Sequence, residues 1–233
     1  MTPFAFYRQH ALWLLACLLA LLWLERYPQL DFTLQAWFYD PAIGHFPLQD
    51  AGWLEWLNHR LAKYLVLATG TVLAWQAWRQ RDSRRLLTVA AMLLASGVVA
   101  WLKSESAHSC PWDLQAFGGS ASWFPLFGQL THAAGPGHCF PGGHASAGFS
   151  LLALAYWQWP LRPTLGRRLF WLGMAAGLLM GFGQMLRGAH FLSHNLWSGW
   201  LVWLSCCVLF ACHDLLWQPW RQRSAVRRML SVV

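Results

Sequence analysis

The sequence predicts an all-α integral membrane protein, a helical bundle of about six transmembrane helices with both the N- and C-termini in the cytoplasm. Three observations lead to this prediction. Hydrophobic residues make up 57% of the 233-residue chain and charged residues only 11%, whereas a soluble domain has about 25% charged residues. Apolar runs of near-membrane length recur along the chain, and basic residues gather in alternate loops. We expect residues 1–233 to form a single membrane domain.

The apolar runs define the expected helices in order. They lie at 7–24, 61–78, 85–103, 144–163, 168–187 and 194–215. The first run begins like a signal peptide, but it continues past Cys17 and the ERYPQ that follows has no small-residue cleavage site. We therefore expect a retained first span rather than a cleaved leader.

The loops between these runs set the expected orientation. Twelve of the seventeen basic residues fall on one side of the membrane: Arg8, Arg79, Arg81, Arg84, Arg85, Arg162, Arg167, Arg168, Arg221, Arg223, Arg227 and Arg228. The other five are Arg26, Arg60, Lys63, Lys103 and Arg187. The positive-inside rule makes the first side cytoplasmic, including a basic tail at 216–233.

The outer side then holds two segments, 26–60 and 104–143, and most of the polar side chains. The first segment is amphipathic and aromatic, so we expect it to lie on the membrane surface. Eight of the ten histidines fall on the outer side or at its boundary: 45, 59, 108, 132, 138, 144, 190 and 194. The net charge of +8 is explained by topology, because the basic residues form no stripe with interleaved aromatics. We expect no nucleic-acid partner.

The stretch PGGH, residues 141–144, opens the fourth run with a glycine turn. Two glycines let successive N–H groups converge, and a helix N-terminus adds partial positive charge, so Gly142 and Gly143 form a candidate anion site. His144 lies at its edge, where it could donate a proton. Lys103 ends the third run on the same side, and Arg187 ends the fifth.

Three stretches in this order resemble the signature of the type 2 phosphatidic-acid phosphatase superfamily: KSESAHSCP (103–111), PGGH (141–144) and GQMLRGAHFLSH (183–194). That signature is K-x6-R-P, P-S-G-H and S-R-x5-H-x3-D. The chain looks like a divergent bacterial member with CPWDL and PGGH variants of the motifs. The resemblance covers roughly residues 60–215 and implies a membrane lipid phosphatase that needs no metal or other cofactor.

The resemblance assigns roles to individual residues. Lys103, Pro111, Pro141, Gly143, His144 and His190 match motif positions. The family's chemistry would make His190 the nucleophile that forms a phosphohistidine and His144 the acid that protonates the leaving group. Lys103, Gly142 and Gly143 would hold phosphoryl oxygens.

The sequence departs from the signature at five positions. Cys110 and Gln184 stand where the family has arginines, His194 replaces its orienting aspartate, and Gly142 and Gly183 replace serines. Arg187, three residues after Gln184, lies on nearly the same helical face and is expected to bind phosphate beside it. His194 is expected to steady the nucleophile, and Asp113 or Glu105 could supply a carboxylate.

Cys110 and Cys139 are the two cysteines of the outer face, and each adjoins a motif. In an oxidising compartment they are candidates for a disulfide, with free thiols as the alternative. Together with the charge pattern, they indicate a bacterial inner membrane with the site on the periplasmic face. The lipid substrates that the resemblance implies are undecaprenyl pyrophosphate, phosphatidylglycerol phosphate, phosphatidic acid and lipid A.

Four other functions remain open at this point. A lipid phosphotransferase would use the same residues, and a degenerate family member would use none of them. A metal or haem site could use His190 and His194, but Ser193 as a helix N-cap would separate the two side chains. A transporter or structural protein is the non-enzyme alternative, although transporters bind near mid-bilayer and often contain repeats, and this sequence contains no repeat. The sequence does not predict an oligomeric state.

Overall fold

The computed structural model describes residues 2–129 and 133–217, and the regular structure within them is helical, without β-strands. The predicted all-α class is therefore confirmed. His132 and most of the predicted basic tail, including Arg221, Arg223, Arg227 and Arg228, lie outside the described residues.

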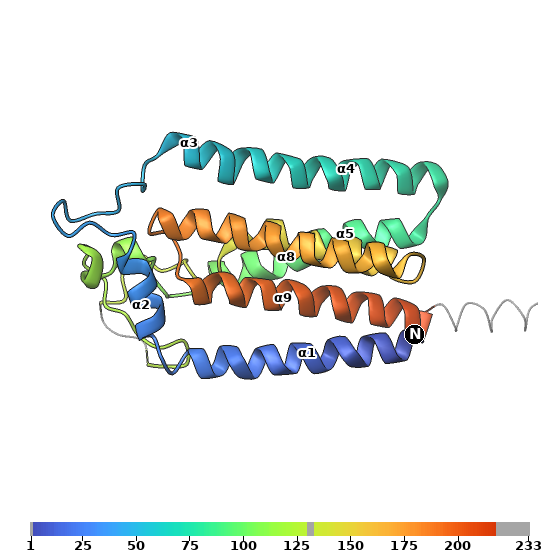
Figure 1. Ribbon diagram of the computed structural model, residues 1–233, viewed down its shortest axis with the longest axis horizontal. Coiled ribbons are helices and arrows are strands. Elements are labelled where there is room, and N and C mark those ends of the chain that lie inside the picture. Colours follow the sequence, from blue (N-terminus) through green and yellow to red (C-terminus); the bar gives the residue numbers. More distant parts are fainter. Residues whose placement is uncertain (1, 130–132, 218–233) are drawn as a thin grey trace, which may run out of the picture.

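The long helices run side by side along the long axis of the molecule (Figure 1). They are α1 (Pro3–Leu24), α4 (Ala62–Gln80), α5 (Ser83–Ser104), α8 (Pro163–Leu186) and α9 (Leu192–Ala211). The shorter elements are α2 (Gln29–Ala36), α3 (Gly52–Leu54), η1 (Glu55–Leu61), η2 (Pro111–Asp113), η3 (Gln115–Phe117), α6 (Gly143–Phe149), α7 (Leu152–Gln158) and η4 (Cys212–Trp217). The loops around α2 and the segments 105–129 and 133–142 lie at one end of the bundle.

A helix or a helix pair occupies each of the six predicted runs, but only part of the predicted span number is confirmed. Within the described chain, four helical stretches are long and apolar enough to cross a membrane: Pro3–Leu24, Ser83–Glu105, Pro163–Leu186 and Leu192–Trp217. These four indicate a multi-pass membrane protein.

The predicted run 144–163 is not one continuous helix. The helix α6 ends at Phe149, α7 begins at Leu152, and α7 ends at Gln158 rather than at residue 163. The hydroxyl of Ser150 donates to the carbonyl of Ala147 at 2.7 Å, and the N–H of Leu151 donates to Gly148 at 3.2 Å. These shorter-range bonds replace the regular ladder and account for the break.

Glycines let α6 approach α8 closely at this break. A Cβ atom on Gly148 would lie 2.7 Å from the carbonyl carbon of Ala176, and one on Gly177 would overlap the ring of Phe149. Phe149 is 1% exposed and also lies against Gly199 of α9. Small residues are therefore required where α6, α8 and α9 meet, as in other tightly packed membrane helices.

Three tryptophans of α9 connect the last long helix to the first one. Trp200 Nε1 donates to the carbonyl of Leu14 at 2.9 Å, and Trp203 Nε1 donates to His10 Nδ1 at 3.0 Å. Trp197 Nε1 donates to the carboxylate of Glu25, which follows α1, at 2.8 Å. We call these three contacts the tryptophan ladder.

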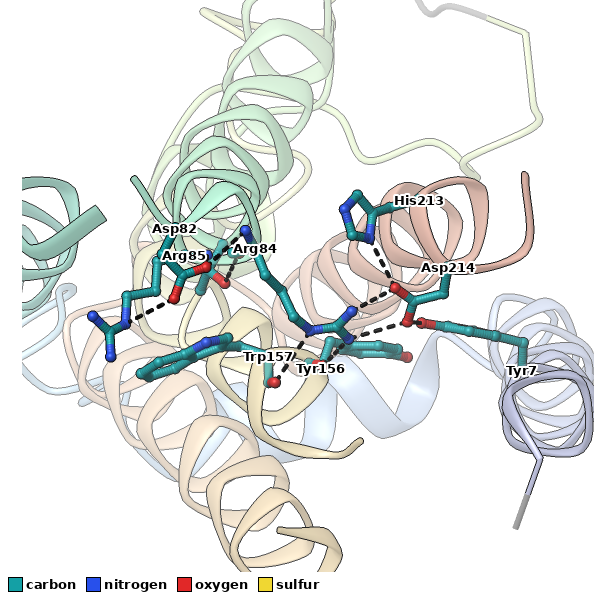
Figure 2. A network of polar contacts seen from close by, with 9 residues as sticks. Tyr7, Asp82, Arg84, Arg85, Tyr156, Trp157, His213 and Asp214 are labelled. Carbon is teal, nitrogen blue, oxygen red and sulfur yellow. Dashed lines mark hydrogen bonds and ion pairs between the residues drawn. The ribbon is translucent and has the colours of Figure 1, made fainter. Parts of the chain in front are cut away.

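A buried polar network joins four elements at the end of the bundle away from α2 (Figure 2). The Arg84 guanidinium, at the start of α5, forms an ion pair with Asp214 of η4. It also donates to the carbonyl of Tyr156 at 2.9 Å, near the end of α7. Tyr7 of α1 donates its hydroxyl to Asp214 at 2.6 Å. Because both charges are paired and hydrogen-bonded, the network tolerates burial.

Candidate active site

The PGGH turn docks directly on the start of α9. Gly142 is the N-cap residue of α6, and its N–H donates to the carbonyl of His194 at 3.0 Å. Ser198 Oγ lies 2.9 Å from the Gly142 carbonyl and 3.0 Å from the His194 carbonyl. The N–H of Gly142 is therefore engaged within the protein, and the donors available to an anion in the first turn of α6 begin at Gly143.

The structure brings the three predicted histidines together. The ring centroids of His144 and His190 lie 6.2 Å apart, and those of His190 and His194 lie 5.8 Å apart. His190 is 2% exposed and His194 is 6% exposed. His190 lies before the first residue of α9 and His194 lies inside the helix, so the two side chains do not share a helix face.

Burial lowers the pKa of His190 well below its ordinary value, and nearby positive charge on His194, Lys103 and His144 adds to the effect. A hydrogen bond with the backbone of Cys139 acts in the opposite direction. His190 is therefore a neutral imidazole at neutral pH, which is the form that can act as a nucleophile.

One predicted phosphate ligand, Lys103, lies close to this group, and another, Gln184, lies in the last turn of α8. The Cδ atom of Lys103 lies 3.3 Å from the position of a Cβ on Gly143, which places the lysine stem against the PGGH turn. Gln184 is 1% exposed, and its Nε2 amide has no hydrogen-bond partner among the described residues. A buried, unpaired donor is costly to leave unsatisfied, so Gln184 Nε2 is available to an oxyanion.

The third predicted phosphate ligand is held by a different segment. Arg187 Nε donates to the carbonyl of Gln49 at 2.9 Å, so part of its guanidinium faces the outer segment 26–60. Asp113, a predicted orienting carboxylate, lies in η2. Its pKa is raised by burial and lowered by hydrogen bonds from the Cys110 backbone and from Trp112, which place its carboxylate beside those residues.

Two asparagines explain why glycine stands at positions 142 and 183. A Cβ on Gly142 would lie 2.5 Å from Asn195 Oδ1, and a Cβ on Gly183 would overlap the side-chain amide of Asn58. Asn195 Nδ2 donates to the carbonyls of Gly181 and Phe191, both at 3.2 Å. Real Cβ contacts are essentially never shorter than 3.0 Å, so a serine at either position requires its asparagine neighbour to move.

The loop before the PGGH turn is held to the end of α5 by covalent and hydrogen bonds. Cys110 and Cys139 form a disulfide with a Cα–Cα distance of 5.1 Å. The N–H of His138 donates to Ser106 at 2.7 Å, and that of Cys139 donates to His108 at 2.9 Å. The segment that follows Lys103 is thereby fixed beside the turn that precedes His144.

Sequence reasoning missed several residues around the site, and its N-cap prediction was wrong. The helix α9 begins at Leu192 with Phe191 as its N-cap residue, so Ser193 lies inside the helix. Asn195 and Ser198 were not predicted, because isolated polar residues in an apolar run form no motif. The available signal was spacing: Asn195 follows Phe191 by four residues and Ser198 follows His194 by four, which places them on the same helix face. Within the described residues, no group of three or more His, Cys, Asp or Glu residues could hold a metal ion.

Comparison with known protein families gives a match that covers most of the helical bundle. The model of the PAP2 superfamily matches residues 84–218, more than half of the chain. No curated protein and no solved structure matches the chain.

Proposed function

Because this chain belongs to the PAP2 superfamily, we propose that it hydrolyses a lipid phosphate monoester or pyrophosphate through a phosphohistidine on His190. Membership of this superfamily confirms the predicted resemblance and indicates a phosphatase acting on phosphate esters. The observation that carries the proposal is the cluster of His144, His190 and His194 beside Lys103, at one end of an apolar helical bundle.

The proposed reaction has two steps. A ring nitrogen of neutral His190 attacks phosphorus while the bond to the lipid oxygen breaks, and His144 gives a proton to the departing oxygen. Water then attacks the phosphohistidine, His144 accepts a proton from it, and inorganic phosphate leaves with His190 restored. His194, packed against His190, keeps the attacking ring in position.

Charge on the transferred phosphoryl group needs fixed donors, because its oxygens carry negative charge through the transition state. We assign this binding role to Lys103, to the N–H of Gly143 and to the amide of Gln184. Gly142 supports the turn rather than donating, since its N–H already serves His194. Arg187 contributes its remaining guanidinium donors from the side of Gln49.

An apolar groove supports a lipid as the substrate. It has a volume of about 520 Å³ and is lined by residues of η1, α4, α6 and α8, among them Leu65, Gly148, Leu179 and Gly183. Gly183, in the lining, is next in sequence to Gln184, and in our proposal an acyl or prenyl chain occupies this groove with its phosphate at the histidines. Volumes of this size accommodate chain-like or drug-sized ligands.

The proposed setting is a bacterial inner membrane crossed six times. In this arrangement α4 and the α6–α7 pair also span the bilayer, both termini are cytoplasmic, and the histidines face the periplasm. The end of α4 and the starts of α5 and α8, which carry Arg79, Arg84 and Arg162, lie at the bundle end away from α2 (Figure 1), in agreement with the positive-inside rule. An oxidising periplasm also suits the Cys110–Cys139 disulfide.

The test is phosphate release by detergent-purified protein from phosphatidic acid, phosphatidylglycerol phosphate, a prenyl pyrophosphate and a soluble aryl phosphate, with a chelator present. We expect release from a lipid substrate, weaker release from the aryl phosphate, and loss of release in His190→Ala. The matched control is His45→Ala, a histidine on the outer segment whose Nδ1 contacts the Phe46 carbonyl at 3.2 Å; this variant should retain full activity.

Labelling with a ³²P-lipid tests the intermediate directly. Label on the protein that is lost in acid, survives alkali and is missing in His190→Ala supports the phosphohistidine. Unchanged turnover in His190→Ala would exclude His190 as the nucleophile. Label that passes to an added acceptor lipid, in place of water, would identify a phosphotransferase.

A further inference from the structure

A carboxylate from outside the matched region caps α9. Asp31 lies on α2, and its Oδ1 accepts the backbone N–H of Ser193 at 3.0 Å, across 162 residues of sequence. The N-cap residue of α9, Phe191, makes no side-chain capping bond of its own. Asp31 therefore satisfies an N-terminal donor that the helix leaves open, and its negative charge faces the positive end of the helix dipole.

The same carboxylate borders a small polar cavity that reaches the histidine cluster. The cavity has a volume of about 20 Å³, and its polar lining residues are Glu25, Asp31, His108, Ser193 and His194. A space of this size with several polar partners has the dimensions of a site for one water molecule.

Asp31 differs in its hydrogen bonds from the other titratable groups at the cavity. Burial raises its pKa, while hydrogen bonds from Ser193 and from the backbone of Leu192 lower it. Glu25, the second carboxylate at the cavity, is already engaged by Trp197 Nε1 at 2.8 Å. Burial also lowers the pKa of His108, so that imidazole is neutral at neutral pH. Of the two carboxylates at the cavity, Asp31 is therefore the one that accepts a hydrogen bond from the N-terminus of α9.

We propose that Asp31 is a positioning residue that supplies from α2 the orienting carboxylate that the family signature places at position 194. It fixes the first turn of α9 and, through one water molecule in the shared cavity, orients the imidazole of His194 against His190. The effect of Asp31 on turnover rests on the function proposed above, whereas its effect on the His194 ring does not.

The test compares Asp31→Asn with Glu25→Gln, two exchanges of carboxylate for amide at one cavity. Asparagine can still accept the Ser193 N–H and is an equally good capping residue, so Asp31→Asn removes charge and leaves the cap. We expect kcat to fall roughly tenfold to hundredfold, as for other residues that orient a catalytic imidazole through a second contact, with KM unchanged. Glu25→Gln should change kcat by less than about twofold, since its partner is the Trp197 indole.

Two further readouts distinguish positioning from a purely structural cap. In Asp31→Asn the acid limb of the pH–rate profile should move to lower pH, because the variant loses an anion that favours protonation of the adjoining His194 and His190 pair. In a His194→Asp background, which restores a direct carboxylate, Asp31→Asn should cost little further activity. An equal loss in both backgrounds, or an unchanged kcat in Asp31→Asn, would overturn the proposal.

A third readout needs no turnover. In ¹⁵N-histidine-labelled protein, with the His194 signals assigned by their disappearance in His194→Gln, Asp31→Asn should shift the His194 ring resonances and Glu25→Gln should not. Unshifted resonances refute the role of Asp31 even if the enzyme is active. If Asp31→Asn shifts the His194 resonances as expected but the wild-type protein releases no phosphate from any lipid, only the proposed function is overturned.

Discussion

Restoring the family serine at position 142 should damage this protein rather than improve it. The signature has P-S-G-H where this chain has PGGH, so Gly142→Ser converts the motif to its usual form. In this structure the new Cβ would lie 2.5 Å from Asn195 Oδ1, well inside van der Waals contact. Either Asn195 moves and weakens its bonds to Gly181 and Phe191, or the turn moves away from α9.

The expected cost follows from these contacts. Overpacking a filled site costs about 1–3 kcal/mol, and the two asparagine hydrogen bonds at risk contribute roughly 0.5–1.5 kcal/mol each. If the turn moves instead, the bond between Gly142 and His194 is strained and the donor at Gly143 is misplaced, which costs up to about a hundredfold in rate. We therefore expect Gly142→Ser to lower the free energy of unfolding by about 1–3 kcal/mol and to lower kcat.

The assay is phosphate release together with thermal unfolding in detergent, for Gly142→Ser, Asn195→Ala and the double variant. Asn195→Ala removes the oxygen that the serine would meet, so the double variant should be more stable than the sum of the single effects by about 1–3 kcal/mol. If the stability effects of Gly142→Ser and Asn195→Ala are strictly additive, the new side chain at position 142 does not contact Asn195. A Gly142→Ser protein that is more active and equally stable would refute the reasoning altogether.

Three other predictions concern packing, covalent structure and pH. Gly177→Ala should destabilise the bundle by about 1–3 kcal/mol in thermal unfolding, because the new Cβ overlaps the ring of Phe149. The control is Gly97→Ala, whose new Cβ would have no neighbouring atom within 4 Å; it should be neutral or stabilising by up to about 1 kcal/mol. Replacing Cys110 and Cys139 by serine should cost roughly 3–4 kcal/mol, the loop-closure value for about 30 residues, and unchanged melting would contradict it. The acid limb of kcat/KM should lie below pH 6.5, because the pKa of His190 is lowered and the ring becomes protonated, hence inactive, only as the pH falls through that lowered pKa. A limb at or above pH 6.5 would show that another group controls it.

The sequence predicted much of the helical frame because its signals are local. The run 85–103 falls within α5, and the run 168–187 overlaps α8, which begins earlier, at Pro163. Both runs could be predicted because the length and polarity of each run are decided by adjacent residues. The break after Phe149 had no such signal. A mainly apolar run does not predict the bonds from Ser150 and Leu151 to the preceding turn, and the close packing of α6 against α8 at this point depends on residues 28 positions away.

The histidine cluster was predicted through motif order, whereas its supports were not. His144 and His190 are motif residues, but Asp31 and Asn58 contact the site region from segments far earlier in the chain. Asp31 had one visible signal, as an acidic residue in the short amphipathic stretch QLDFTLQA. Its partner could not be named without the fold, because pairings over such separations leave no periodicity in a single sequence.

The tryptophan ladder has a consequence for the order in which the chain assembles during synthesis. Its acceptors, including His10 and the Leu14 carbonyl, belong to or directly follow α1, and its donors belong to α9, which is synthesised later. At a synthesis rate of about 5–20 residues per second, roughly ten to forty seconds separate the appearance of the two helices. During that interval α1 lacks its indole partners, although the Leu14 carbonyl lies inside a helix and His10 Nδ1 also contacts the Tyr156 hydroxyl at 2.9 Å. Closure of the bundle around α1 is thus a late event, because the tryptophan ladder forms only after α9 has been synthesised.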